Sequence, residues 1–302
     1  MSSNGTGPTP KRVTVPWLRE ARAEDRRIAM VTAYDAPSAR LADAAGIDAI
    51  LVGDSIGSNV LGFANELPVT MDDMVRATRA VSGAAYRALV VADMPFGSYQ
   101  CNEDEAVANA VRLVKEGGAQ AVKFEGAGRA LALIERLSHC GIPVMGHVGF
   151  TPQSTHALGG ARVQGKTRAS AQAILDAARE IQFAGAFSIV LELIPAPLAR
   201  TITGSLTIPT IGIGSGPHCD GQVQIWHDIL GLGGERTFRH VRRYANLGPL
   251  IRDAIASYAL DVQGGQFPTM EHAVSMDLDQ LDNLDGDERF PSEAQKEESG
   301  EG

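Results

Sequence analysis

The chain has 302 residues, 44% of them hydrophobic and 21% charged, a composition typical of a globular protein that buries a large core without disulfides. It has no run of about 18 apolar residues, which excludes a membrane-spanning helix. The net charge of −9 is confined to the C-terminus, because residues 271–302 carry 11 acidic and 2 basic side chains and the other 270 carry 25 of each. A neutral body gives no electrostatic reason to expect nucleic-acid binding.

The three cysteines, Cys101, Cys140 and Cys219, form no CxxC pair. An odd number without that spacing argues against a disulfide framework and a structural zinc site, and it is typical of reduced cysteines in a cytosolic protein. The first residues, MSSNGTGPTPKR, also lack the apolar segment of a signal peptide. We therefore expect a cytoplasmic protein.

The N-terminal region begins with a polar segment that leads into a helix. Residues 1–12 are rich in Gly, Pro and polar side chains, so we expect a disordered tail. Thr14 then offers an N-cap, Pro16 suits the first turn, and Trp17 and Leu18 fall on the side to be buried. We expect this helix to cap the base of a barrel.

From residue 28 onward, short apolar runs alternate with amphipathic stretches. Runs that are apolar at nearly every position indicate strands buried on both faces, as in a parallel sheet. The stretches between them open with acidic turns, such as Met71–Val75 and Glu103–Val107, which suit a helix N-terminus. The eighth run is the weakest because His227 and Asp228 interrupt it. The predicted strands are Ile28–Ala33, Ala49–Gly53, Ala88–Ala92, Ala121–Phe124, Ile142–Gly146, Phe187–Leu193, Thr210–Ile213 and Val223–Leu230.

Eight strand–helix units over about 230 residues predict an α/β fold, a closed (β/α)₈ TIM barrel. A doubly wound sheet is the structural alternative, but it needs a nucleotide-binding loop after its first strand. The glycine-rich segment Gly212–Gly216 reads GxGxG and follows the seventh predicted strand instead. We expect the catalytic barrel to span residues 13–275, and residues 276–302 to form a disordered acidic tail.

Polar residues stand where the predicted strands end, which is where barrel enzymes carry their catalytic groups. A single Asp at such a position is commonly a helix N-cap or turn residue, so each keeps that structural alternative. In chain order these residues are Asp54, Ser55, Asp93, Lys123, Glu125, His147 and Glu192.

Carboxylates that converge on one barrel mouth repel one another, and burial strengthens the repulsion. A bound cation is the simplest way to stabilise such a set. Carboxylate oxygens are hard ligands, so they favour Mg²⁺ over Zn²⁺. Mg²⁺ keeps positions open for substrate, and a 2-oxo acid could fill them with its carboxylate and keto oxygens.

Proton removal beside the carbonyl of such an acid requires a general base. Glu192 lies in the apolar string IVLELI, where burial should raise the pKa of its carboxyl toward neutrality. Lys123 could anchor the substrate carboxylate, although a lysine in a barrel strand can also be a Schiff-base nucleophile. The pattern predicts metal-assisted carbanion chemistry and leaves both roles of Lys123 open.

Longer strings carry more specific information than the spacing does. They are VGDSIG (52–57), LPVTMDDM (67–74), ADMPFGSY (92–99), VKFEG (122–126), GHVGFTPQS (146–154), GGARVQGK (159–166), LELIPAPLA (191–199), IPTIGIGSGPHCDGQVQIWHD (208–228) and FPTMEHA (267–273). Together they closely resemble the ketopantoate hydroxymethyltransferase family over roughly residues 13–275. The family often has Ala at the position of Ser215, and the acidic tail here is longer than we expect for it.

The resemblance implies a barrel of the phosphoenolpyruvate/pyruvate type. The implied reaction is transfer of a hydroxymethyl group from 5,10-methylenetetrahydrofolate to 3-methyl-2-oxobutanoate. Its product is 2-dehydropantoate, in the first committed step of pantothenate and coenzyme A synthesis. A cytoplasmic homodecamer is implied as well.

The resemblance also assigns roles to the residues at the strand ends. Asp54 and Asp93 would bind one Mg²⁺ per subunit, with Glu125 as a further ligand, either direct or through water. The oxo acid would contact Asp54, Ser55, Asp93, Lys123 and His147. Glu192 would be the catalytic proton acceptor.

Two alternatives to this function come from different classes of protein. A lyase or mutase of the phosphoenolpyruvate-barrel type would present a catalytic Cys in a KKCGH-like string, and no cysteine here has that context. A barrel that has lost catalysis and serves as a binding protein would be expected to lack one of the carboxylates, yet all four are present. The hydroxymethyltransferase remains the main prediction.

Overall fold

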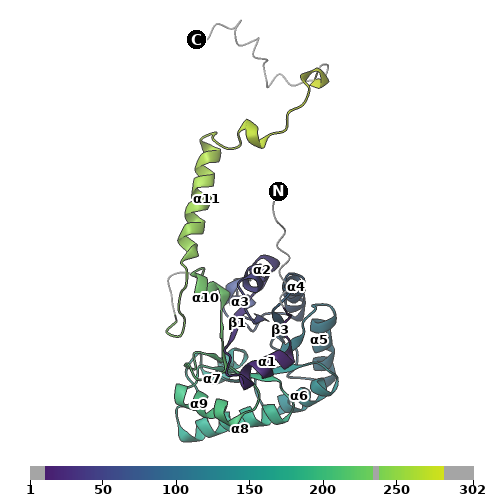
Figure 1. Cartoon of the computed structure of the whole chain (residues 1–302), viewed down its shortest axis with the longest axis vertical. Coiled ribbons are helices and arrows are strands. Elements are labelled where there is room, and N and C mark those ends of the chain that lie inside the picture. The colour runs from purple at the N-terminus through teal and green to yellow at the C-terminus, as the bar shows by residue number, and fades with distance from the viewer. Residues whose placement is uncertain (1–10, 234–237, 282–302) are drawn as a thin grey trace. The chain divides into compact units, whose positions relative to one another are not determined.

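Eight parallel strands close into a barrel in the computed structural model, which describes residues 11–233 and 238–281 (Figure 1). Neighbouring strands follow the order of the chain, and β8 pairs back with β1 through Ile28 and Gly221. The predicted (β/α)₈ barrel is therefore confirmed. The strands are β1 Ile28–Thr32, β2 Ala49–Val52, β3 Leu89–Asp93, β4 Ala121–Lys123, β5 Val144–Gly149, β6 Ser188–Glu192, β7 Thr210–Ile213 and β8 Gly221–Gln224.

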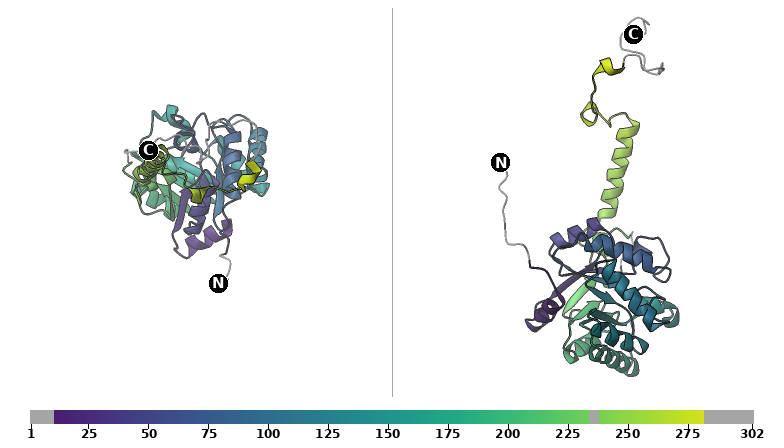
Figure 2. Two further views of the ribbon diagram at one scale, coloured as in Figure 1. Left: turned by 90° about the horizontal axis from the view of Figure 1, so that it is seen from above. Right: turned by 90° about the vertical axis from the view of Figure 1, so that its right-hand side faces the viewer.

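Helices surround the barrel, as Figures 1 and 2 show from three directions. The described residues also form three short 3₁₀ helices, η1 Pro152–Ser154 after β5, and η2 Met270–His272 and η3 Leu278–Leu281 nearer the C-terminus. The α-helices are α1 Val15–Ala23, α2 Ala36–Ala44, α3 Ile56–Asn59, α4 Met71–Ser82, α5 Glu103–Lys115, α6 Arg129–His139, α7 Thr155–Leu158, α8 Arg168–Phe183, α9 Ala196–Ser205, α10 Trp226–Leu230 and α11 Leu247–Gln263.

The strands bury apolar side chains on both faces, as their near-continuous apolar runs predict. Val31, Ile50 and Val90 belong to a large core cluster that also contains residues of the surrounding helices. Leu51 and Val91, the next residues along β2 and β3, belong to a second cluster. Because side chains alternate along a strand, the second cluster fills the inside of the barrel and the first lies between strands and helices.

Helix α1 packs against the second cluster, at the amino ends of the strands. Leu18 and Ala21 are buried there together with Ile28 and Leu89, which lie at or near the starts of β1 and β3. Thr14 is the N-cap, and its hydroxyl accepts a hydrogen bond from the backbone N–H of Trp17 at 3.4 Å. The predicted capping helix is confirmed, and it leaves the carboxyl ends of the strands clear for chemistry.

Local capping explains where the helices begin. Thr70 precedes α4 and accepts a hydrogen bond from the backbone N–H of Asp73, whose carboxylate accepts one from the N–H of Thr70. Asn102 caps α5 in the same way by accepting from Asp104 and Glu105. Such caps stabilise a helix by about 1 kcal/mol each, and both helices begin at the acidic turns that the sequence indicates.

The eighth predicted strand, Val223–Leu230, is wrong beyond Gln224. The strand β8 begins two residues earlier, at Gly221, and residues Trp226–Leu230 form the helix α10. The carbonyl of Ile225 accepts from the N–H groups of Asp228 and Ile229, both at 3.1 Å. These bonds wind the apolar residues of this segment into a helix, so an apolar run alone does not define a strand.

Contacts divide the chain into two compact units, Met1–Gly248 and Pro249–Gly302. The first contains the whole barrel. In the second, the ring centroid of Phe267 lies 5.8 Å from that of Tyr258 and 4.8 Å from that of His272. The predicted catalytic domain, 13–275, extends over both units, and its boundary at 275 stays a prediction.

The two predicted tails lie largely outside the part that the structure describes. Residues 1–10 of the predicted N-terminal tail and 282–302 of the predicted acidic tail are not among the described residues. Within the described ranges, no helix is long and apolar enough to cross a membrane. All three cysteines are free thiols, as expected, and only Cys219 is buried.

Candidate active site

The carboxyl ends of five neighbouring strands, β2 to β6, bring the predicted residues to one end of the barrel. Asp93 and Lys123 are the last residues of β3 and β4 and are direct partners in the sheet register. Glu192 is the last residue of β6, and His147 lies within β5. Asp54 stands two residues beyond the end of β2. Parallel strands and short connections therefore collect these side chains without any long insertion.

A buried ion pair forms the first half of the site. The ammonium Nζ of Lys123 donates to Oδ1 of Asp93 at 2.7 Å, and the side chains are only 6% and 4% exposed. The other oxygen, Oδ2, accepts the backbone N–H of Asp54 at 3.1 Å. Burial alone would lower the pKa of Lys123, but the carboxylates of Asp93 and Asp54 outweigh it and raise this pKa. The charged form of Lys123 is therefore favoured at neutral pH.

The surroundings of Asp54 disfavour the charged form of its carboxyl. Burial, followed by the negative charge of Asp93, raises the pKa of Asp54 to about 7. The charge of Lys123 and a hydrogen bond from Gln153 act in the opposite direction. An additional cation near Asp54 and Asp93 would thus be stabilised by both carboxylates, since one ammonium offsets only part of their charge.

His147 lies between two carboxyl groups in the second half of the site. Its Nε2 is 3.2 Å from Oε2 of Glu192, and its Nδ1 is 3.7 Å from Oε1 of Glu125. Within the described residues neither ring nitrogen makes a hydrogen bond, although His147 is only 2% exposed. Burial, and then the charge of Lys123, hold the pKa of His147 well below its usual value. The ring is neutral, and it has polar atoms to offer to a ligand.

Glu192 has the properties of a general base. Burial raises the pKa of its carboxyl to about 7, as the sequence led us to expect. Glu125, at 8% exposure, also has a raised pKa because of burial and then the charge of Asp54. The residue after Glu192, Leu193, has φ 46°. A branched residue in this left-handed region is strained, and such strain is concentrated at functional sites.

Gly149 allows the two strands that carry His147 and Glu192 to approach. Its φ is +100°, and a Cβ there would overlap the carbonyl oxygen of Glu192. That oxygen accepts the N–H of Phe150 at 2.8 Å. Gly149 is therefore a steric requirement of the site.

We expect Gly149→Ala to lower the free energy of unfolding by about 2–4 kcal/mol, because a strained backbone and a steric overlap add together. Gly141→Ala is the matched control, since Gly141 has φ +80° and open space around its missing Cβ. Chemical denaturation of both variants measures the difference. Equal stability of the two would show that β5 and β6 can separate freely.

Sequence reasoning missed three residues of the site. The Tyr34 hydroxyl lies 2.8 Å from Oγ of Ser55, and burial raises its pKa. Gln153 and Tyr99 form hydrogen bonds with Asp54 and Glu125, respectively. Tyr34 follows β1 by two residues, as Asp54 follows β2, so the rule of polar strand ends could have found it.

The donor set fits a hard divalent cation without forming a closed cage. Across residues 11–233 and 238–281, no three side chains of His, Cys, Asp or Glu are arranged as a complete metal site. Mg²⁺ usually takes only one or two protein carboxylates and fills its other positions with water and substrate. Asp54 and Asp93, whose charges Lys123 offsets only in part, match that pattern.

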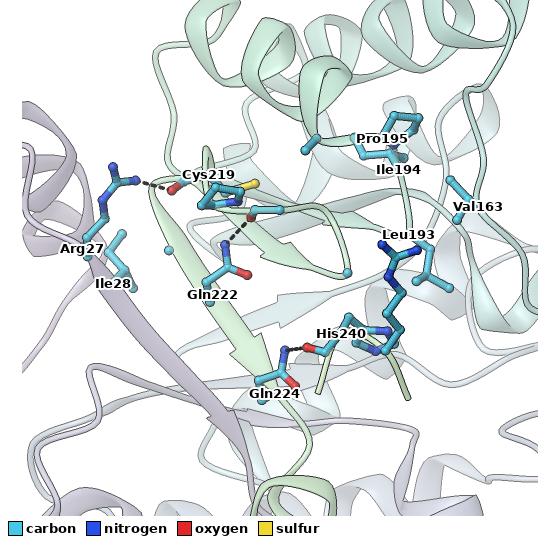
Figure 3. A pocket seen from close by; sticks show the side chains of 16 residues that line it. Arg27, Ile28, Val163, Leu193, Ile194, Pro195, Cys219, Gln222, Gln224 and His240 are labelled. Atoms are coloured by element: carbon cyan, nitrogen blue, oxygen red, sulfur yellow. Dashed lines mark hydrogen bonds between the residues drawn. The ribbon is translucent and has the colours of Figure 1, made fainter. Parts of the chain in front are cut away.

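A separate cavity of about 910 Å³ lies beside β7 and β8 (Figure 3). Leu193, Gln222 and His240 are among its lining residues, and Gln222 donates to the carbonyl of Gly216 at 2.9 Å. None of the predicted site residues lines it. We assign the chemistry to the buried charged cluster, because proton transfer and cation binding require its titratable groups.

The sequence profile of the family described as ketopantoate hydroxymethyltransferase matches residues 12–270. The chain belongs to this family. One relative is the 3-methyl-2-oxobutanoate hydroxymethyltransferase of Roseiflexus sp. (strain RS-1). It is 54% identical over 89% of this chain and 97% of its own length. The protein with the same description from Thermobifida fusca (strain YX) is 52% identical over 88% of this chain and 95% of its own.

Solved structures of other enzymes have a fold similar to that of this ketopantoate hydroxymethyltransferase family member. Phosphonopyruvate hydrolase in complex with oxalate and Mg²⁺ has a TM-score of 0.55 and 15% identity, covering 95% of this chain and 98% of its own. A 2,3-dimethylmalate lyase, described as a member of the PEP mutase/isocitrate lyase superfamily, has a TM-score of 0.53 and 17% identity, over 90% and 91%. These likenesses show the same barrel fold, and the phosphoenolpyruvate type of the barrel stays a prediction.

Proposed function

We propose that the protein transfers a hydroxymethyl group from 5,10-methylenetetrahydrofolate to 3-methyl-2-oxobutanoate, giving 2-dehydropantoate. Family membership and relatives of that description at 54% and 52% identity support the reaction. The observation that carries the chemistry is the position of Glu192 at the end of β6, where its Oε2 lies 3.2 Å from Nε2 of His147. Burial there raises the pKa of the Glu192 carboxyl to about 7. A base with such a pKa is half ionised at neutral pH.

Asp54 and Asp93 would hold one Mg²⁺ ion per subunit, with Glu125 reaching it through water. Gln153 links Glu125 to Asp54, because its backbone N–H donates to Oε2 of Glu125 at 3.0 Å and its side chain donates to Oδ2 of Asp54 at 2.8 Å. When bound, Mg²⁺ would supply Lewis-acid polarisation of the oxo-acid carbonyl. Asp54 and Asp93 offer only carboxylate oxygens, which are the hard ligands that Mg²⁺ prefers.

The side chains of the protein would bind the oxo acid and move one proton. Glu192 accepts the proton from C3, and the electron pair left behind is delocalised into the adjacent carbonyl as an enolate. Lys123 provides positive charge that favours the anionic substrate, and Ser55 contacts it through a hydroxyl held by Tyr34. Water replaces both folate nitrogens on the one-carbon unit, which releases tetrahydrofolate and leaves a formaldehyde-level carbon. C3 of the enolate then bonds to that carbon, and its oxygen takes up a proton to become the hydroxyl of the hydroxymethyl group.

The raised pKa of Lys123 argues against its alternative role as a Schiff-base nucleophile. An amine must lose its proton to attack a carbonyl, and the carboxylates of Asp93 and Asp54 keep this one protonated. His147 is neutral and lies 3.2 Å from Oε2 of Glu192, a position that suits a contact with the bound oxo acid. We further propose a cytoplasmic homodecamer, for which family membership is the support.

The direct test supplies purified protein with both substrates and Mg²⁺ and follows 2-dehydropantoate by chromatography. We expect turnover that EDTA abolishes and that added Mg²⁺ restores. Phosphonopyruvate serves as the comparison substrate, because a structural neighbour is described as its hydrolase. Cleavage of phosphonopyruvate without formation of 2-dehydropantoate would replace the proposed function by the lyase alternative.

A further inference from the structure

Gln153 occupies the centre of a buried hydrogen-bond network at the candidate site. It is the middle residue of η1, directly after β5, and is 6% exposed. Its side-chain nitrogen Nε2 donates to Oδ2 of Asp54 at 2.8 Å and to the carbonyl of Met94 at 2.9 Å. Its oxygen Oε1 accepts from the hydroxyl of Tyr99 at 2.6 Å and from Gln100 at 3.0 Å. Both donor positions and both acceptor positions of this amide therefore take part in hydrogen bonds.

The partners determine which end of the amide faces Asp54. The carbonyl of Met94 can only accept, so it must face the nitrogen of Gln153. The hydroxyl of Tyr99 accepts the backbone N–H of Glu125 at 3.1 Å, which leaves its own proton for Oε1 of Gln153. Hydrogen bonds therefore run in one direction, from Glu125 through Tyr99 and Gln153 to Asp54, and each bond polarises the next.

The backbone of Gln153 closes this network into a loop. Its N–H donates to Oε2 of Glu125 at 3.0 Å. One residue thus holds both Asp54 and Glu125, which stand 99 and 28 residues away in the sequence. Partners behind the ligands of a metal commonly change its affinity by about 10–100-fold.

We propose that Gln153 is a positioning residue, whose amide fixes the rotation of the Asp54 carboxylate and couples it to Glu125 through Tyr99. The importance of Gln153 for catalysis rests on the proposed function, whereas its positioning of Asp54 rests on the hydrogen bonds alone. A glutamate at this position would set a second carboxylate against Asp54, and an apolar side chain would leave Oδ2 of Asp54 without its donor. Glutamine matches the requirement for a donor and an acceptor at the two ends of one planar group.

The test compares Gln153→Met with Gln222→Met in the full-length, metal-free protein. Methionine keeps the length of glutamine and removes its hydrogen bonds. Gln222 is a fair control because its amide bonds the carbonyl of Gly216, away from the carboxylates. By calorimetric titration with Mg²⁺, we expect Gln153→Met to bind about 10–100-fold more weakly and Gln222→Met to bind as the wild type does. Tyr99→Phe should show a smaller loss, and it remains available if Gln153→Met does not fold.

Crystal structures of the variants give a readout that is independent of Mg²⁺ and of turnover. We expect the Asp54 carboxylate to rotate in Gln153→Met and to keep its place in Gln222→Met. An unmoved Asp54 with unchanged Mg²⁺ affinity would overturn the proposal. Rotation of Asp54 in a protein that makes no 2-dehydropantoate would instead refute the proposed function and leave the positioning role standing.

Discussion

Glu192→Gln is expected to slow removal of the C3 proton of 3-methyl-2-oxobutanoate by about 10²–10⁴-fold, the usual contribution of a general base. The amide has the shape of the carboxyl but cannot accept the proton. Folding should survive, because burial already disfavours the charge of Glu192, as its raised pKa of about 7 shows. Exchange of the C3 proton for deuterium, followed by NMR, measures the rate.

The pH dependence of this exchange has a defined sign. A raised pKa means that Glu192 is protonated, and inactive as a base, below about pH 7. The wild-type rate should therefore rise about tenfold per pH unit up to that value and then level off. Glu192→Gln should lack this rise. Exchange by the variant at the wild-type rate would show that another group is the base.

Lys123→Met is expected to cost about 3–5 kcal/mol of folding stability, the usual penalty for removing one partner of a buried ion pair. Its ammonium lies 2.7 Å from Asp93 at 6% exposure. Without it, the charges of Asp93 and Asp54 are left facing each other in a buried site. Chemical denaturation in EDTA measures the loss, and Mg²⁺ should restore part of it.

Two further variants separate this ion pair from the general loss of a lysine. Lys115→Met on α5 removes an exposed lysine and should leave stability close to that of the wild type. Asp93→Asn added to Lys123→Met removes the abandoned charge and should recover much of the loss. The effect of Asp93→Asn on the free energy of unfolding is measured in the wild type and in Lys123→Met. An equal loss in both backgrounds would show that the two residues are not coupled.

The fold could be predicted because the sequence repeats one simple pattern. Strands buried on both faces must be apolar throughout, so β2 and β6 stand out as AILV and SIVLE. The strand β8 could not be found in this way. Its sequence is GQVQ, and a Cβ on Gly221 would lie 2.6 Å from the carbonyl oxygen of Ile28. That strand is defined by close approach to β1, a tertiary property that a local pattern does not contain.

The residues of the candidate site likewise fall into those that a local pattern predicts and those that only the folded structure brings together. Asp54, Asp93 and Glu192 could be predicted because parallel strands end on one side, so polar residues at strand ends must meet. Gln153 could not, since it reaches Asp54 from a 3₁₀ turn after another strand and only the folded barrel brings them together. The neutral state of His147 also depends on burial that the sequence does not report.

We propose that the carboxylates at the barrel mouth hold a divalent cation and remove a proton from the oxo acid. The most direct measurement is wild-type exchange of the C3 proton of 3-methyl-2-oxobutanoate in D₂O, without the folate, in Mg²⁺ and in EDTA. We expect exchange in Mg²⁺ that EDTA suppresses by at least about 10²-fold, because polarisation of the carbonyl acidifies C3. Exchange that proceeds equally fast in EDTA would contradict the metal assignment of Asp54 and Asp93.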